Sequence, residues 1–284
     1  MKIFFAGAER FLDILIDNGA KNLLFSAYYL IKDKGTEKLY KAREAGCTIF
    51  LDSGAHTFHK LGGLFWGKKR KSEIRLNRKE LEKEILKYQE KYINFLIKNR
   101  KAIDIAIELD VAVVTDWNFQ IKLKDNFKQA GTTITEVWHQ KVTPDPENEW
   151  IDMCRRNSNG LIAIEGTRSI GEYNAKLKVA ERFNTKVHGF ALTREEYMLK
   201  LPFYSIDSTS WLSGGRYGTT FFACNKFRSE DKMFRRKIKN HLIERGIDYK
   251  KIENDEYREV HKADLKYWLE FEKFIHSRSK KYWN

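Results

Sequence analysis

The sequence is poor in proline and has no long apolar runs. The first feature argues against two domains joined by a linker, and the second argues against a membrane-spanning protein. Only three prolines occur among 284 residues, and no Ser/Gly-rich linker divides the chain. We therefore expect one barrel-sized domain with an appendage rather than two equal domains. No apolar run approaches the length of a membrane span, and no charged-then-apolar leader precedes the first predicted strand. These features predict a soluble, cytoplasmic protein without a membrane partner.

Cysteine is also scarce. The three cysteines, Cys47, Cys154 and Cys224, lie far apart in the chain. This spacing provides neither a disulfide framework nor a Cys-x-x-Cys metal knuckle. We expect all three to be reduced and structural.

The positive charge is concentrated in two segments. Of a net charge of +14, residues 60–101 carry +9 and residues 225–284 carry +6, which leaves −1 for the remainder. Two basic segments on a near-neutral scaffold are expected of a polyanion binder, although lysine also serves solubility alone. The neutral remainder favours nucleic acid, because a uniform lysine bias would have charged the whole chain.

Eight apolar runs recur along the chain, and segments with helical spacing separate them. Leu81, Ile85 and Tyr88, for example, lie on one face of a helix predicted over residues 78–98. Strands too apolar to alternate, separated by helices, indicate a parallel sheet covered on both faces. Eight such units predict a closed (β/α)8, TIM-like barrel. The predicted strands are Lys2–Ala6, Asn22–Tyr28, Thr48–Asp52, Ile103–Asp110, Thr135–His139, Gly160–Gly166, Lys186–Leu192 and Phe203–Asp207.

The C-terminal part of the chain differs in composition from the rest. We assign residues 1–218 to the barrel and residues 219–284 to a small, basic, helical extension packed on it. Lysine and aromatic residues are frequent in the extension, and helical spacing recurs over residues 232–245 and 263–276. Its predicted buried side comprises Trp268, Leu269 and Ile275.

Acidic side chains stand where several predicted strands end. In a barrel of this kind, catalytic groups lie at the carboxyl ends of the strands and in the loops that follow. Asp52, Asp110 and Asp207 meet this rule, and Glu108, His139, Glu165 and His188 lie near other strand ends. Two carboxylates that face one sugar support displacement at its anomeric carbon, where one attacks and the other handles a proton. Asp207 and Asp52 form the best pair for this chemistry.

Each of these acids also has a structural interpretation. Asp52-Ser-Gly is suited to a turn and a helix cap, and Asp207 with its following Ser, Thr and Gly residues to a surface turn. Asp110 is either the partner of a basic group or an anionic acceptor for the N1–H and 2-amino edge of a guanine. The basic run Lys68, Lys69, Arg70 and Lys71 lies in the loop after Asp52, which should overhang the barrel mouth and contact phosphates.

Two motifs resemble the guanine transglycosylase family. Residues 203–218 are similar to the end of that family's barrel, where a nucleophilic Asp is followed by Gly-Arg-x-Gly. The matching residues are Asp207 and Gly215-Arg216-Tyr-Gly218, without a gap. Leu51-Asp-Ser53-Gly54 resembles the family's turn that carries the second catalytic Asp. The resemblance covers about residues 48–218.

The resemblance implies roles for further residues. In strand order, Asp110 falls on the family's base-reading Asp, His139 on its base-reading Gln, and Gly166 on the Gly whose backbone contacts the base. The remaining substrate-binding positions implied are Ser53, Gly54, Gly215 and Arg216.

The sequence also departs from the family pattern. Ala55 replaces the second Gly of the turn, His139 replaces Gln, and Ser208 replaces the Cys that follows the nucleophile. The Cys-x-Cys-x-x-Cys…His zinc site of the tRNA-modifying enzymes has no counterpart, because Cys224 and His241 are too few to form it. The compact form looks most like the branch that acts on DNA, which is found in viruses and bacterial modification clusters.

This branch implies a DNA-guanine transglycosylase that replaces guanine in DNA with a 7-deazaguanine base such as preQ0, through a covalent aspartyl-deoxyribose intermediate and without a cofactor. A virus-encoded member would act in the host cytoplasm. Two alternatives stay open: tRNA is the substrate, or the protein is a non-catalytic nucleic-acid-binding paralogue. Acids at both catalytic positions, Asp52 and Asp207, argue against the second alternative. The sequence leaves the oligomeric state open.

Overall fold

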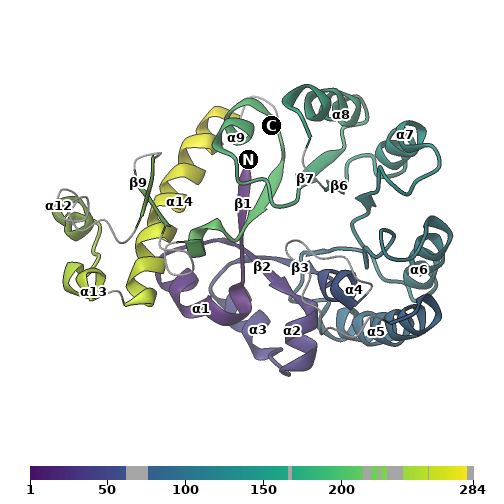
Figure 1. The fold of residues 1–284 in the computed structure, drawn as a ribbon, viewed down its shortest axis with the longest axis horizontal. Helices are drawn as coiled ribbons and strands as arrows, with labels where there is room; N and C mark the ends of the chain where they lie inside the picture. The colour runs from purple at the N-terminus through teal and green to yellow at the C-terminus, as the bar shows by residue number, and fades with distance from the viewer. Residues whose placement is uncertain are drawn as a thin grey trace.

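The computed structural model contains eight parallel strands in one curled sheet (Figure 1). The structure describes residues 1–61, 76–165, 168–213, 219–222, 225–228, 239–254 and 256–279. The strands are β1 (Lys2–Ala6), β2 (Asn22–Ser26), β3 (Thr48–Asp52), β4 (Ile105–Ala106), β5 (Val137–Trp138), β6 (Leu161–Ile164), β7 (Lys186–Gly189) and β8 (Ser205–Ser208). Their order is β4-β3-β2-β1-β8-β7-β6-β5.

A short contact joins the two outer strands of this order. Ile107 and Thr135, which lie next to β4 and β5, form a parallel bridge, and the Thr135 N–H donates to the Ala106 carbonyl at 2.7 Å. Helices surround the strands (Figure 1). The parallel order and this bridge confirm the predicted TIM-like (β/α)8 fold.

The connections between successive strands are mainly helical. The helices of the barrel are α1 (Ala8–Asp17), α2 (Ala27–Lys32), α3 (Glu37–Glu44), α4 (His56–Leu61), α5 (Arg78–Asn99), α6 (Trp117–Gln129), α7 (Pro146–Arg156), α8 (Ile170–Arg182) and α9 (Glu195–Lys200), with a 3₁₀ turn η1 (Ser210–Leu212) after β8. The predicted start of α5 is confirmed. The Asn77 side chain accepts from the Glu80 N–H and the Glu80 carboxylate accepts from the Asn77 N–H, which forms a capping box.

The strand side chains divide between two buried clusters, because successive residues point to opposite faces of the sheet. The inner cluster comprises Phe4, Ala6, Leu24, Phe50, Ile107, Val137 and Ala163. Intervening residues such as Ile3, Phe5 and Leu51 belong to the larger cluster between the strands and the helices. Both faces of the sheet are therefore apolar, which explains the continuous apolar runs in the sequence.

Strands β1 and β3 have the predicted bounds, and the other strands are shorter than predicted. The largest differences are at β4 and β5, which have two residues each. Near them, the Glu108 carboxylate accepts a hydrogen bond from the Val137 N–H. A buried side chain thus takes a backbone donor that would otherwise extend the ladder between β4 and β5.

The described part of the C-terminal extension contains a hairpin and three helices. These elements are β9 (Thr219–Phe222), β10 (Asn225–Arg228), α12 (Lys239–Glu244), α13 (Tyr249–Glu253) and α14 (Tyr257–Ser279). In Figure 1, α14 lies beside α1, and α12 and α13 lie farther from the barrel. Trp268 and Ile275 are buried against the barrel core as predicted, and Leu269 is half-buried. The hairpin was not predicted, because the sequence indicated only helices in this extension.

One carboxylate of α14 attaches the extension to the sheet. The Glu272 Oε1 atom accepts hydrogen bonds from the Ile3 N–H at 2.8 Å and from the Asn22 side-chain amide at 2.9 Å. The Trp211 indole N–H of η1 donates to the Ala6 carbonyl at 3.0 Å, and the Trp211 ring contacts the His261 ring of α14. The elements before and after residue 218 are thus connected by the hydrogen bonds of Glu272 as well as by apolar and aromatic packing.

Candidate active site at the carboxyl ends of the strands

Asp52 and Asp207 both point into the barrel. Phe50, two residues before Asp52, belongs to the inner cluster, and strand alternation places Asp52 on the same side. Asp207 likewise shares its side with Ser205, which contacts the interior residue His188. Both acids stand at the carboxyl ends of their strands, where barrel enzymes carry their catalytic groups.

The Asp52 carboxyl has an unusual proton affinity. Burial is the largest cause and raises the pKa of Asp52. The Gly54 N–H donates to Oδ2 at 3.0 Å and opposes this effect. The carboxylates of Asp207 and Asp110 raise the pKa further. Together these effects raise the pKa of Asp52 from 3.8 to about 7. Asp52 therefore exchanges its proton near neutral pH, as a general acid or base should.

The turn after Asp52 depends on a glycine. Gly54 has a φ of 82°, in the left-handed region, and a Cβ atom there would lie 2.5 Å from the Tyr28 Cβ. The neighbouring Ser53 is buried, and its carbonyl accepts from the Tyr88 hydroxyl at 2.6 Å. These contacts hold the Gly54 N–H where it reaches the Asp52 carboxylate.

Replacing Gly54 with Ala is expected to destabilise the protein by more than about 2 kcal/mol, because the added methyl group meets backbone strain and the Tyr28 side chain together. Gly19→Ala is the matched control, since Gly19 has a φ of 83° and open space around its Cβ position. This control should lose only about 1 kcal/mol. Urea unfolding of both variants measures the difference, and equal losses would mean that Tyr28 moves aside without cost.

Asp207 is held by the backbone of the β7–α9 connection. Its Oδ1 atom accepts from the Ala191 N–H at 2.8 Å and lies 3.4 Å from His188 Nε2. Ala191 has a φ of 52°, an uncommon conformation for a residue with a side chain. A strained residue that donates to a predicted catalytic group is typical of a functional site.

Asp110 forms a buried ion pair with His139. The His139 Nδ1 atom lies 3.2 Å from Asp110 Oδ1, and its Nε2 atom lies 3.3 Å from Glu108 Oε1. Burial by itself lowers the pKa of His139, but the two carboxylates outweigh it and raise the pKa to about 9. His139 is therefore an imidazolium at neutral pH, with a carboxylate oxygen near each ring nitrogen.

The Glu108 carboxylate is the centre of this network. It is fully buried, accepts from the Gln120 side-chain amide at 3.0 Å and lies 3.6 Å from Lys124 Nζ. Burial acts to raise the pKa of Glu108, but Lys124 and His139 lower it below its ordinary value. Lys124 also pairs with Glu136 at 3.0 Å. Charges of alternating sign thus connect the surface near Glu136 with Asp110 at the barrel mouth.

Three more ionisable groups surround the mouth. Burial raises the pKa of Glu9, at the start of α1, and of Glu165, after β6. His59 Nε2 lies 2.8 Å from the Asp110 carbonyl, and burial lowers its pKa. The sequence placed Glu108 and Glu165 near strand ends without a role, and it did not indicate Glu9 or His59. In the sequence, an ionisable residue within or next to an apolar run was the feature that could have identified such groups.

The other predicted site residues lie outside the described residues. They are Gly166, Gly215, Arg216, Lys68, Lys69, Arg70 and Lys71. Cys47 and Cys154 are free and buried, and Cys224 also lies outside the described residues. The described site therefore brings together Asp52, Ser53, Gly54, Asp110, His139 and Asp207.

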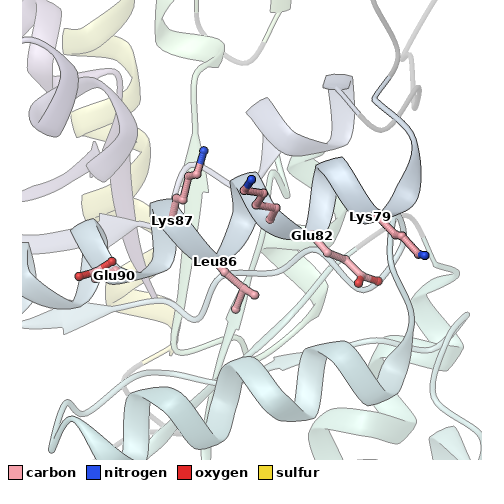
Figure 2. Close-up of a pocket in the computed structure, with 6 residues that line it drawn as sticks. Lys79, Glu82, Leu86, Lys87 and Glu90 are labelled. Carbon is pink, nitrogen blue, oxygen red and sulfur yellow. The ribbon is translucent and has the colours of Figure 1, made fainter.

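A shallow depression lies on the outside of the barrel. Figure 2 shows its lining, which comes from one side of α5 and comprises Lys79, Glu82, Lys83, Leu86, Lys87 and Glu90. The opposite side of α5, with Leu81 and Ile85, packs on the barrel. The lining is mostly exposed and carries charges of both signs, as expected for a solvated helix surface.

Within the described residues, no group of three or more His, Cys, Asp and Glu side chains is arranged to hold a metal ion. No described helix combines the length and apolarity that a bilayer-spanning segment requires. In comparisons with known proteins, no protein-family model matches the chain, and no curated protein is significantly similar to it in sequence.

Proposed function

We propose that this protein is a DNA-guanine transglycosylase that exchanges guanine for a 7-deazaguanine base. The observation that carries this proposal is the pair of inward-facing carboxylates at the ends of β3 and β8. The charge of Asp207 raises the pKa of Asp52, so the two carboxyl groups lie close enough to interact electrostatically. A double displacement at a sugar carbon requires one carboxylate that attacks and a second that exchanges a proton near neutral pH, as Asp52 does.

In the first half of the reaction, Asp207 forms a bond to C1′ of the deoxyribose while the bond from C1′ to guanine N9 breaks. The electron pair of that bond stays with guanine, which takes a proton from Asp52. In the second half, Asp52 removes the N9 proton of the incoming 7-deazaguanine, whose nitrogen attacks C1′ and releases Asp207. A pKa of about 7 allows Asp52 to serve in both directions.

The target nucleotide has to leave the DNA stack for this chemistry. The acids lie inside the mouth of a barrel, and a base paired in duplex DNA cannot enter it. We therefore infer that the enzyme flips out the target deoxyguanosine. The basic segments of the sequence would supply the contacts to the flanking phosphates, including the run Lys68–Lys71.

Asp110 is suited to hold the base. Burial raises the pKa of the mostly buried Asp110 carboxyl, but the His139 imidazolium, 3.2 Å away, opposes this effect and favours the anionic acceptor. A guanine or 7-deazaguanine edge offers N1–H and 2-amino donors, which need such an acceptor. His139 and Glu108 then act as positioning residues, because each ring nitrogen of His139 lies within 3.3 Å of a carboxylate oxygen.

Replacing Glu108 with Gln is expected to lower the pKa of His139 by roughly one pH unit and to raise the KM for the free base about tenfold. Loss of one negative charge makes the imidazolium release its proton at a lower pH than the wild-type value of about 9. An NMR titration of the His139 ring measures the pKa without substrate. Glu136→Gln is the control, since Glu136 contacts Lys124 but not His139; a shift of equal size in both variants would contradict the positioning role.

The experiment that tests the proposed function is incorporation of labelled guanine into duplex DNA and into tRNA by the wild-type protein. Exchange into DNA is the expected result. Exchange into tRNA alone would change the substrate, and exchange into neither polymer would favour a non-catalytic nucleic-acid-binding protein. Parallel assays with labelled preQ0 test the incoming base.

A further inference from the structure

A histidine lies in the apolar interior of the barrel, directly beside Asp207. His188 is fully buried, and its ring centroid lies 4.5 Å from that of Phe50, 4.9 Å from that of Phe190 and 6.2 Å from that of Phe4. An apolar side chain would fill this position without the cost of burying an imidazole. Packing therefore gives no reason for a histidine, and its polar contacts must be considered.

His188 connects a serine to the Asp207 carboxylate. Its Nδ1 atom lies 2.9 Å from the Ser205 hydroxyl oxygen, and its Nε2 atom lies 3.4 Å from Asp207 Oδ1. His188 and Ser205 are paired in the register of β7 and β8, and Asp207 follows Ser205 on the same face of β8. The backbone of the barrel thus fixes this row of three side chains.

The contact with Ser205 allows the imidazole to carry its hydrogen on Nε2. The Ser205 hydroxyl is fully buried and can donate to Nδ1, which leaves the hydrogen of a neutral ring on Nε2. An imidazolium also carries a hydrogen on Nε2. In both forms Nε2 carries a hydrogen 3.4 Å from Asp207 Oδ1 by heavy-atom distance, and this contact is not a hydrogen bond in the free protein.

The two donors that face Asp207 make its oxygens different. The Ala191 N–H and His188 Nε2 both approach Oδ1. Both of these contacts, from described residues, are to Oδ1 rather than to Oδ2. The two oxygens of this carboxylate are therefore distinguished before any substrate binds.

We propose that His188, oriented by Ser205, is a positioning residue that holds Asp207 Oδ1 and leaves Oδ2 as the oxygen that attacks the sugar carbon. This inference rests on the proposed transglycosylase function. When Oδ2 bonds to C1′, Oδ1 becomes the ester carbonyl oxygen and keeps both donors. When the ester breaks, the electron pair returns to Oδ2, and His188 keeps its proton throughout.

The first test is His188→Phe, which fills the same apolar space and removes the donor. We expect a melting temperature close to the wild-type value, an unchanged KM for the free base and a kcat about a hundredfold lower, because the nucleophile is no longer held. His188→Gln retains a side-chain N–H near the Nε2 position and should recover about tenfold of this loss. An unchanged kcat in His188→Phe, or a fall in kcat that only follows loss of folded protein, would overturn the proposal.

The second test needs no substrate and separates this inference from the proposed function. Nitrogen-15 NMR of the His188 ring in the wild-type protein should show a hydrogen on Nε2, and Ser205→Ala should change the balance between the two tautomers. A wild-type ring with its only hydrogen on Nδ1 would overturn the positioning role. Absence of base exchange in a wild-type protein that shows the expected tautomer would instead contradict the transglycosylase function.

Discussion

Replacing Asp207 with Asn should abolish the covalent protein–DNA complex and lower base exchange by about four orders of magnitude or more. An amide oxygen is neutral and is a far poorer nucleophile at carbon than a carboxylate. The fold should tolerate the change, because the Asn side chain can still accept a hydrogen bond from the Ala191 N–H. Denaturing gel electrophoresis with a labelled DNA strand measures the complex, with and without added 7-deazaguanine.

Asp104→Asn is the matched control for this experiment. Asp104 lies at the amino end of β4, accepts from the Ile49 N–H at 2.7 Å and pairs with Arg43. Carboxylates at that end of a barrel serve stability rather than catalysis. The control should lower the melting temperature and retain the covalent band. A covalent band that persists in Asp207→Asn and disappears in Asp52→Asn would mean that the two catalytic roles are reversed.

The sequence predicts the fold well because the barrel depends on a repeated pattern. Each strand is buried on both faces, so it appears as an apolar run whose position does not depend on distant contacts. The bounds of β1 and β3 follow from this pattern alone. The ends of β4 and β5 do not, because the Glu108 side chain takes the Val137 N–H, and no local pattern reveals where a buried carboxylate points.

The candidate site, like the fold, was predictable from the sequence only in part. Barrel topology brings strand ends together, so the sequence predicts that Asp52, Asp110 and Asp207 share one rim. It does not predict that His139 lies between two carboxylates or that His188 lies beside Asp207, since both depend on side-chain distances across neighbouring strands. Proton affinities follow from those distances, which is why the pKa of about 7 at Asp52 required the structure.

Replacing Asp52 with Asn is expected to slow base exchange by about a hundredfold or more, because it removes the proton donor and acceptor while the nucleophile stays intact. The covalent complex should still form when guanine leaves without help. The pH dependence is the sharper readout. In the wild-type protein, the rate should be highest near pH 7, where Asp52 is present in both protonation states, and the residual rate of Asp52→Asn should lack this dependence.

The same substitution should make the protein more stable at alkaline pH. The pKa of Asp52 is about 7 in the folded protein and about 3.9 in an unfolded chain, so the folded state binds more protons between these values. Stability contributed by the protonated carboxyl is therefore lost as the pH rises from about 4 to 7. Asn cannot ionise, so Asp52→Asn should gain about 2 kcal/mol at pH 8 and almost nothing at pH 4. This is less than the full pKa difference gives, because Asp52 is only half-buried.

Urea unfolding of the wild-type protein and Asp52→Asn at pH 4, 6 and 8 measures this gain. A difference that grows with pH, together with slower exchange, would show that the Asp52 carboxyl lowers stability and takes part in the chemistry. A loss of stability in Asp52→Asn at pH 8 would mean that the ionised carboxylate is favoured in the folded protein. Asp52 would then be a permanent anion that could not donate a proton to the departing guanine.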